Sequence, residues 1–66
     1  MTPKFNTVYR NIKTSKIVRT YTEEMHKGYR AGRIGFNGID KDGKWFGPGR
    51  GSSYENFLKS YVEVGA

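Results

Sequence analysis

The absence of cysteine sets the strictest limit on how this chain can fold. With 66 residues and no cysteine, it has neither a disulfide framework nor thiolate ligands for a structural metal, which commonly support very small domains. A hydrophobic core must therefore hold the fold, and five Tyr, four Phe and one Trp are available to build it. We expect one small basic domain over residues 1–66.

The C-terminal part of the chain predicts an amphipathic helix. Ser52 and Glu55 have the spacing of a capping box, and Glu55 precedes Lys59 by one helical turn. We therefore expect a helix from about residue 53 to residue 64, packed on a sheet. Apolar residues recur at intervals of three and four, the pattern of one helix face, at Tyr54, Phe57, Leu58, Tyr61 and Val62.

Two β-hairpins are predicted before this helix. Residues 5–12 and 16–22 are rich in Val, Ile, Thr and Tyr, and they flank the short loop Lys13-Thr14-Ser15. Residues 29–39 and 44–46 flank the turn sequence Asp40-Lys41-Asp42-Gly43. Residues 22–28 have the features of a short helical turn. These elements predict an α+β fold, with a small antiparallel sheet of about three or four strands packed by the C-terminal helix.

The path of the chain through the sheet is less constrained. Pairing Ile12 with Ile17 would place Arg10 opposite Arg19, which is repulsive unless an anion lies between them, and a one-residue change in loop length removes the clash. The register of the first hairpin is therefore open. Pro48 has no N–H to donate, so we expect the chain to leave the sheet there, with residues 47–53 as an exit that caps the helix.

Glycines inside the second hairpin point to irregular pairing. Gly32, Gly35 and Gly38 recur within a segment that otherwise favours a strand. Glycine in a strand commonly marks a bulge or a close approach of another backbone. We expect one or the other at these positions.

The charge of the chain favours a polyanionic partner. Twelve Lys and Arg against six Asp and Glu give a net charge of +6, and residues 1–21 hold five cations and no acid. Such a field attracts nucleic acids and acidic protein surfaces. It also serves to keep a small domain in solution.

Cations and aromatic rings are interleaved along the sequence. This combination neutralises phosphates and stacks on bases, but strand alternation alone would also place rings inward and cations outward. Trp45 separates the two interpretations, because an exposed ring beside Lys44 and Arg50 supports binding. Arg50 with the N–H groups near Ser52 and Ser53 is a further anion-site hypothesis. The candidate residues for contact with a nucleic acid or an anion are Arg10, Lys13, Lys16, Arg19, Arg30, Arg33, Lys44, Trp45 and Arg50.

The residues needed for catalysis or metal binding are scarce. His26 is the only histidine, and helix capping accounts for the serines near residue 52. Residues 38–44 have the spacing of a phosphate-binding loop, but Trp45 stands where a hydroxyl should hold magnesium. We expect no enzymatic activity, cofactor, metal or small-molecule substrate.

The second half of the chain resembles, in its layout, the integrase-type DNA-binding domain. The similar segments are Tyr29-Arg30-Ala31, Gly43-Lys44-Trp45-Phe46-Gly47, and residues 54–61. The resemblance implies a small sheet that is backed by one helix and enters the major groove of DNA. This chain departs from the family by inserting residues 48–51 before the helix and by having Phe57-Leu58 in place of an alanine-rich helix, so the resemblance concerns architecture.

Two functions follow from these patterns. The first is a non-catalytic nucleic-acid-binding protein that uses a basic and aromatic sheet face and the Gly-rich loop over residues 44–50, with DNA favoured over RNA. The alternative is a small phage- or mobile-element-type modulator or inhibitor that binds an acidic surface of a larger host protein or enzyme. No apolar run has secretory or membrane-spanning length, so we expect a cytoplasmic protein without a membrane partner.

Overall fold

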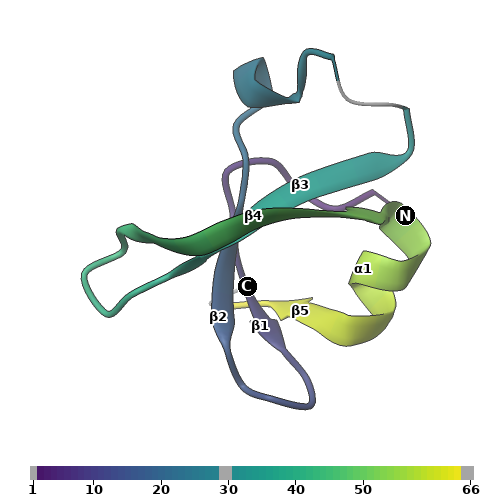
Figure 1. The fold of residues 1–66 in the computed structure, drawn as a ribbon. Helices are drawn as coiled ribbons and strands as arrows, with labels where there is room; N and C mark the ends of the chain where they lie inside the picture. The colour runs from purple at the N-terminus through teal and green to yellow at the C-terminus, as the bar shows by residue number, and fades with distance from the viewer. Residues whose placement is uncertain (1, 29–30, 65–66) are drawn as a thin grey trace.

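The chain folds into an antiparallel sheet with a short helix on one face. The computed structural model describes residues 2–28 and 31–64. Its elements are β1 (Val8–Asn11), β2 (Ile17–Thr20), the 3-10 turn η1 (Glu24–His26), β3 (Arg33–Ile39), β4 (Trp45–Ser53), α1 (Tyr54–Ser60) and β5 (Tyr61–Glu63). The five strands lie in the order β4-β3-β2-β1-β5. Figure 1 shows α1 and η1 on opposite sides of the β3–β4 ribbon.

This architecture confirms the α+β class, the two hairpins and the turn before β3, but the sheet has five strands instead of the expected three or four. Because β3 pairs with β2 as well as with β4, both halves of the chain contribute to one sheet. The integrase-type layout implied that the second half forms a small sheet of its own. The structure differs, because this half shares its sheet with the first half. Neither of the two helical elements in the described segments is long and apolar enough to cross a membrane.

The register of the first hairpin keeps its two arginines apart. Arg10 lies opposite Ile17 and Arg19 lies opposite Val8. The Asn11 side chain sets this register, because its Oδ1 accepts hydrogen bonds from the backbone N–H groups of residues 13 and 14, at 2.9 and 3.0 Å. The turn thus begins at Asn11, two residues before the expected loop, and the predicted repulsion does not arise.

The prediction that the chain leaves the sheet at Pro48 is wrong. β4 continues to Ser53, and its second half pairs with β3 from Phe36 to Arg33. Proline is tolerated there because β4 is an edge strand. The residues expected to form a Gly-rich loop and a helix-capping exit therefore belong to one strand.

A bulge absorbs the residues around the proline. Between two paired positions, β3 contributes one residue, Asn37, whereas β4 contributes three, residues 47–49. The Asn37 amide Nδ2 donates to the carbonyl oxygens of Phe46 and Gly47, each at 3.0 Å. Gly47 has φ +80°, which glycine adopts without strain. The side chain of Asn37 thus replaces the ladder bonds that the bulge interrupts, and the expected irregularity at the glycines of β3 is confirmed at Gly38.

The C-terminal helix is shorter than the apolar pattern predicted. α1 ends at Ser60, and Tyr61–Glu63 form β5, which pairs with β1. Tyrosine and valine favour strands, and β1 would otherwise have a free edge. The helix is capped by Ser53 rather than Ser52, since Ser53 Oγ accepts from the N–H of Asn56 at 3.2 Å. The i to i+4 ion pair between Glu55 and Lys59 is confirmed at 3.2 Å.

The core lies between α1 and the sheet. Phe57 is the one buried residue of α1. Its ring stacks on Tyr61 at 4.6 Å between centroids and meets Tyr9 edge-on at 4.9 Å and Phe36 at 5.0 Å. Val62, expected on the helix stripe, is exposed on β5. The buried apolar residues are Tyr9, Val18, Ile34, Phe36 and Phe57.

The N-terminal segment and η1 cover part of the opposite face. His26 Nε2 accepts from the N–H of Gly35 at 2.8 Å, and His26 Nδ1 lies 2.9 Å from the carbonyl oxygen of Thr22. The Phe5 ring lies 4.7 Å from the imidazole. Tyr21 still donates its N–H to the carbonyl oxygen of Gly35, but its own carbonyl oxygen accepts from the N–H of Asn6, so His26 supplies the acceptor for the N–H of Gly35.

Replacing Phe57 with alanine should lower the free energy of unfolding by about 3–5 kcal/mol, because it removes a buried ring and leaves a cavity. Urea unfolding followed by far-UV circular dichroism measures the loss. The matched control is Phe46→Ala, whose ring is 71% exposed and whose removal should cost less than about 0.5 kcal/mol. Equal losses for the two variants would contradict this packing.

Candidate functional site

The two faces of the sheet carry different side chains. Alternation places Tyr9, Val18 and Phe36 on the face covered by α1, and these are buried. Arg10 and Arg19 lie on the opposite face. α1 is only seven residues long, so it covers one end of its face and leaves the other end open.

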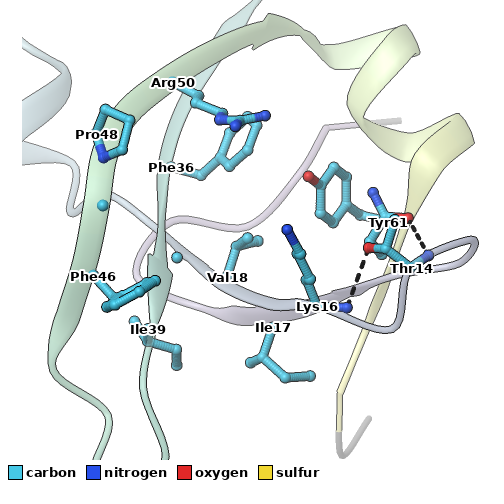
Figure 2. Close-up of a pocket in the computed structure, with 13 residues that line it drawn as sticks. Thr14, Lys16, Ile17, Val18, Phe36, Ile39, Phe46, Pro48, Arg50 and Tyr61 are labelled. Carbon is cyan, nitrogen blue, oxygen red and sulfur yellow. Dashed lines mark hydrogen bonds between the residues drawn. The ribbon is translucent and has the colours of Figure 1, made fainter.

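The uncovered end forms a hollow of about 430 Å³, hereafter the open hollow. It exists because β3 has no side chain at Gly38, the core-facing position after Ile34 and Phe36. A Cβ atom at Gly38 would lie 3.0 Å from the carbonyl oxygen of Phe46, so the close approach of β4 favours glycine at this position. Figure 2 shows the main side chains that line the open hollow, which are Lys16, Val18, Phe36, Phe46, Arg50 and Tyr61.

Two cations and several rings meet in the open hollow. Arg50 lies opposite Phe36 across the β3–β4 pair, and its guanidinium group extends beside that ring (Figure 2). The Lys16 side chain rises toward Tyr61 from the end of the first hairpin turn (Figure 2). Among the described residues that line the hollow there is no Asp or Glu. The site therefore combines apolar area with uncompensated positive charge.

The other sequence-predicted residues do not join this site. Lys13 is exposed in the β1–β2 turn and Lys44 is exposed beside the β3–β4 turn. Arg33 lines a second hollow of about 260 Å³ together with Phe5 and His26. Arg30 lies outside the described residues. The candidates on the face opposite α1 are Arg10, Arg19 and Trp45.

Trp45 is exposed but lies apart from Arg50. The residue is 48% exposed, and its ring meets Tyr21 edge-on at 5.6 Å. Because neighbouring residues in a strand point to opposite faces, Phe46 rather than Trp45 shares the open hollow with Arg50. Trp45 is thus exposed, as a binding role would require, but Arg50, its expected neighbour, lies on the other face of the sheet.

The rings of the open hollow were missed by the sequence reasoning. Phe46 and Tyr61 are absent from the residues that the sequence predicted for contact with a nucleic acid or an anion, although Phe46 lies within the predicted binding segment 44–50. The adjacency of Trp45 and Phe46 was the available signal, since two consecutive rings in a strand cannot share a face. The meeting of Phe46 with Arg50 was not predicted, because the chain was expected to leave the sheet at Pro48, whereas β4 continues through a bulge that places these two residues opposite Gly38 and Phe36.

The anion site predicted at Ser52 and Ser53 does not form. Both serines belong to β4, and the N–H of Tyr54 already donates to the carbonyl oxygen of Gly32 at 2.9 Å. Ser53 Oγ is engaged in capping α1. Lys44, expected as a neighbour, precedes the other end of β4. Extended pairing with β3 has replaced the loop that the hypothesis required.

No metal-binding cluster is present in the part of the chain that the structure describes, where no three His, Cys, Asp or Glu side chains gather. His26 is engaged by Gly35 and Thr22, as described above. The side chains available to a ligand in the open hollow are cations, rings, aliphatic groups and small polar groups. This set can bind an anion that carries a flat apolar part.

No protein-family model, curated protein or solved structure matches this chain.

Asn37→Ala should lower the free energy of unfolding by about 1–3 kcal/mol, because two carbonyl oxygens in the bulge lose a buried donor. The backbone amide signals of residues 46–49 should shift most in a nitrogen–proton correlation spectrum. Asn56→Ala is the control, since Asn56 is exposed on α1 and alanine favours helix. Unchanged stability and amide signals in Asn37→Ala would show that Asn37 does not hold the bulge.

Proposed function

We propose that this protein binds nucleic acid without catalysing a reaction, and that the open hollow is the centre of its binding surface. The observation that supports the proposal is the meeting of Lys16 and Arg50 with the exposed ring of Phe46 in a hollow lined by no described acid. Cations beside rings suit a polymer of phosphates and bases. The phosphates would meet the cations and the bases would meet the rings.

Among the described residues, the cations predicted to contact a nucleic acid are not engaged in ion pairs with acidic side chains. The three ion pairs within the described residues join Lys4 to Glu63, Lys27 to Glu24 and Lys59 to Glu55. None involves the seven cations of the predicted site that are described. Unpaired cations release their counterions to a polyanion, which supplies sequence-independent affinity. Lys13, at the first hairpin turn, would extend the path of phosphate contacts beyond the hollow.

A second candidate is a small phage- or mobile-element-type modulator that docks on an acidic surface of a larger host protein. The 71% exposure of Phe46 favours it, because aromatic residues and arginine are enriched in protein interfaces and Phe46 shares the hollow with Arg50. The positive charge of Lys16 and Arg50 would attract the carboxylates of an acidic protein surface as well as phosphates. The two candidates differ in how their affinity responds to salt.

The affinity for a labelled oligonucleotide should fall log-linearly with salt between roughly 50 and 200 mM. Lys16→Gln and Arg50→Gln should each reduce the slope by about 1, because each removes one phosphate contact. Fluorescence anisotropy titrations at several salt concentrations measure both effects. Lys59→Gln is the control, since Lys59 is an exposed cation on α1, paired with Glu55, and should leave the slope unchanged.

A pull-down from lysate with and without nuclease distinguishes the two candidates. If the protein binds nucleic acid, it should retain nucleic acid, with any proteins bound to it, only when nuclease is omitted. Retention of one protein at moderate salt after nuclease treatment, with no oligonucleotide binding, would reject the proposal and favour the modulator.

A further inference from the structure

We propose that the open hollow holds one unpaired base, and that the protein consequently prefers single-stranded nucleic acid to a duplex. The inference rests on the proposed function and specifies the form of nucleic acid that the site accepts. It follows from the shape of the hollow, from its rings and from the position of its cations.

The shape of the hollow favours a group that enters edgewise. Its floor is the sheet at Val18, Phe36 and Gly38, and its sides are formed by β4 and by Tyr61 at the start of β5. Figure 2 shows these side chains around a recess rather than on a flat surface. In a duplex, the bases are stacked and paired, so a recess of this kind meets only the sugar–phosphate backbone. A base in a single strand is free to turn into it.

The rings of the hollow suit the face of a base. Phe46 stands at its edge with 71% of its surface exposed, whereas Phe36 is 5% exposed and forms the floor. Stacking on an aromatic ring is available to every base, because each base has a π-face. An exposed phenylalanine gains from such a partner by leaving water. Phe46 is therefore the ring on which a base would stack.

The cations of the hollow suit the phosphates on either side of that base. Lys16 comes from the end of the β1–β2 turn and Arg50 comes from the edge strand β4, so they approach the recess from two separate segments of the chain. A base between them would place its flanking phosphates near positive charge on both sides. The apolar floor at Val18 and Phe36 would not accept a phosphate, which keeps the backbone at the rim.

The exposed ring of Trp45 provides an internal comparison. It adjoins Phe46 in sequence but lies on the opposite face, against Tyr21. Removal of Trp45 and removal of Phe46 are therefore matched changes on two different surfaces. Only the second should affect a base held in the open hollow.

The test compares the affinities of a labelled thymidine oligonucleotide, a uridine oligonucleotide and a duplex, measured by fluorescence anisotropy at one salt concentration. The wild-type protein should bind at least one of the single strands more tightly than the duplex, by roughly tenfold or more, and Phe46→Ala should weaken single-strand binding by a similar factor while changing duplex binding little. Trp45→Ala should leave the single-strand affinity unchanged. Phe46→Trp retains a ring and should preserve the preference.

Three results would overturn the inference. In the first, the wild-type protein binds the duplex as tightly as the single strands, or more tightly. In the second, Phe46→Ala loses single-strand and duplex affinity equally. In the third, Trp45→Ala loses single-strand affinity and Phe46→Ala does not. In each case the protein would still bind nucleic acid, and the proposed function would stand. Absence of binding to every oligonucleotide would instead reject the proposed function and this inference with it.

Discussion

The packing of one ring, Phe57, determines most of what the rest of this structure can do. A seven-residue helix offers a single fully buried side chain to the core, and that ring must contact β1 through Tyr9 and β3 through Phe36. The helix is thereby held over one end of the sheet. The chain then turns back as β5, where Tyr61 stacks on the same ring and β1 gains a partner. The open hollow is the part of the sheet that this compact arrangement leaves uncovered.

The bulge at Asn37 is the second determinant of the surface. Without the extra residues on β4, a regular ladder would keep Phe46 and Arg50 on the same face but four β3 residues apart, rather than opposite Gly38 and Phe36. The amide of Asn37 instead holds the carbonyl groups of Phe46 and Gly47, and glycine at position 47 accepts the positive φ that this bend requires. A buried polar side chain thus sets the positions from which a cation and a ring face the same recess.

The sequence predicted those elements that depend on local chemistry. Asp40 and Gly43 specify the second turn, since Asp40 Oδ1 accepts from two backbone N–H groups and Gly43 has φ +80°. β5 and the continuation past Pro48 were not predicted, because each depends on a partner distant in sequence: β1 for the first, and Asn37 for the second. For the candidate site, charge identified Lys16 and Arg50. The rings beside them could not be assigned, because the face on which a strand residue lies depends on a register that only the assembled sheet defines.

The irregularity of β4 also protects the edge of the sheet. A straight nine-residue edge strand would present an uninterrupted row of donors and acceptors to any other extended chain. Pro48 removes one donor from that row, and the bend at Gly47 breaks its straightness. The residues that shape the recess therefore also oppose aggregation by strand addition. The protein can thus expose the ring of Phe46 on a nine-residue edge strand without offering a regular edge to another chain.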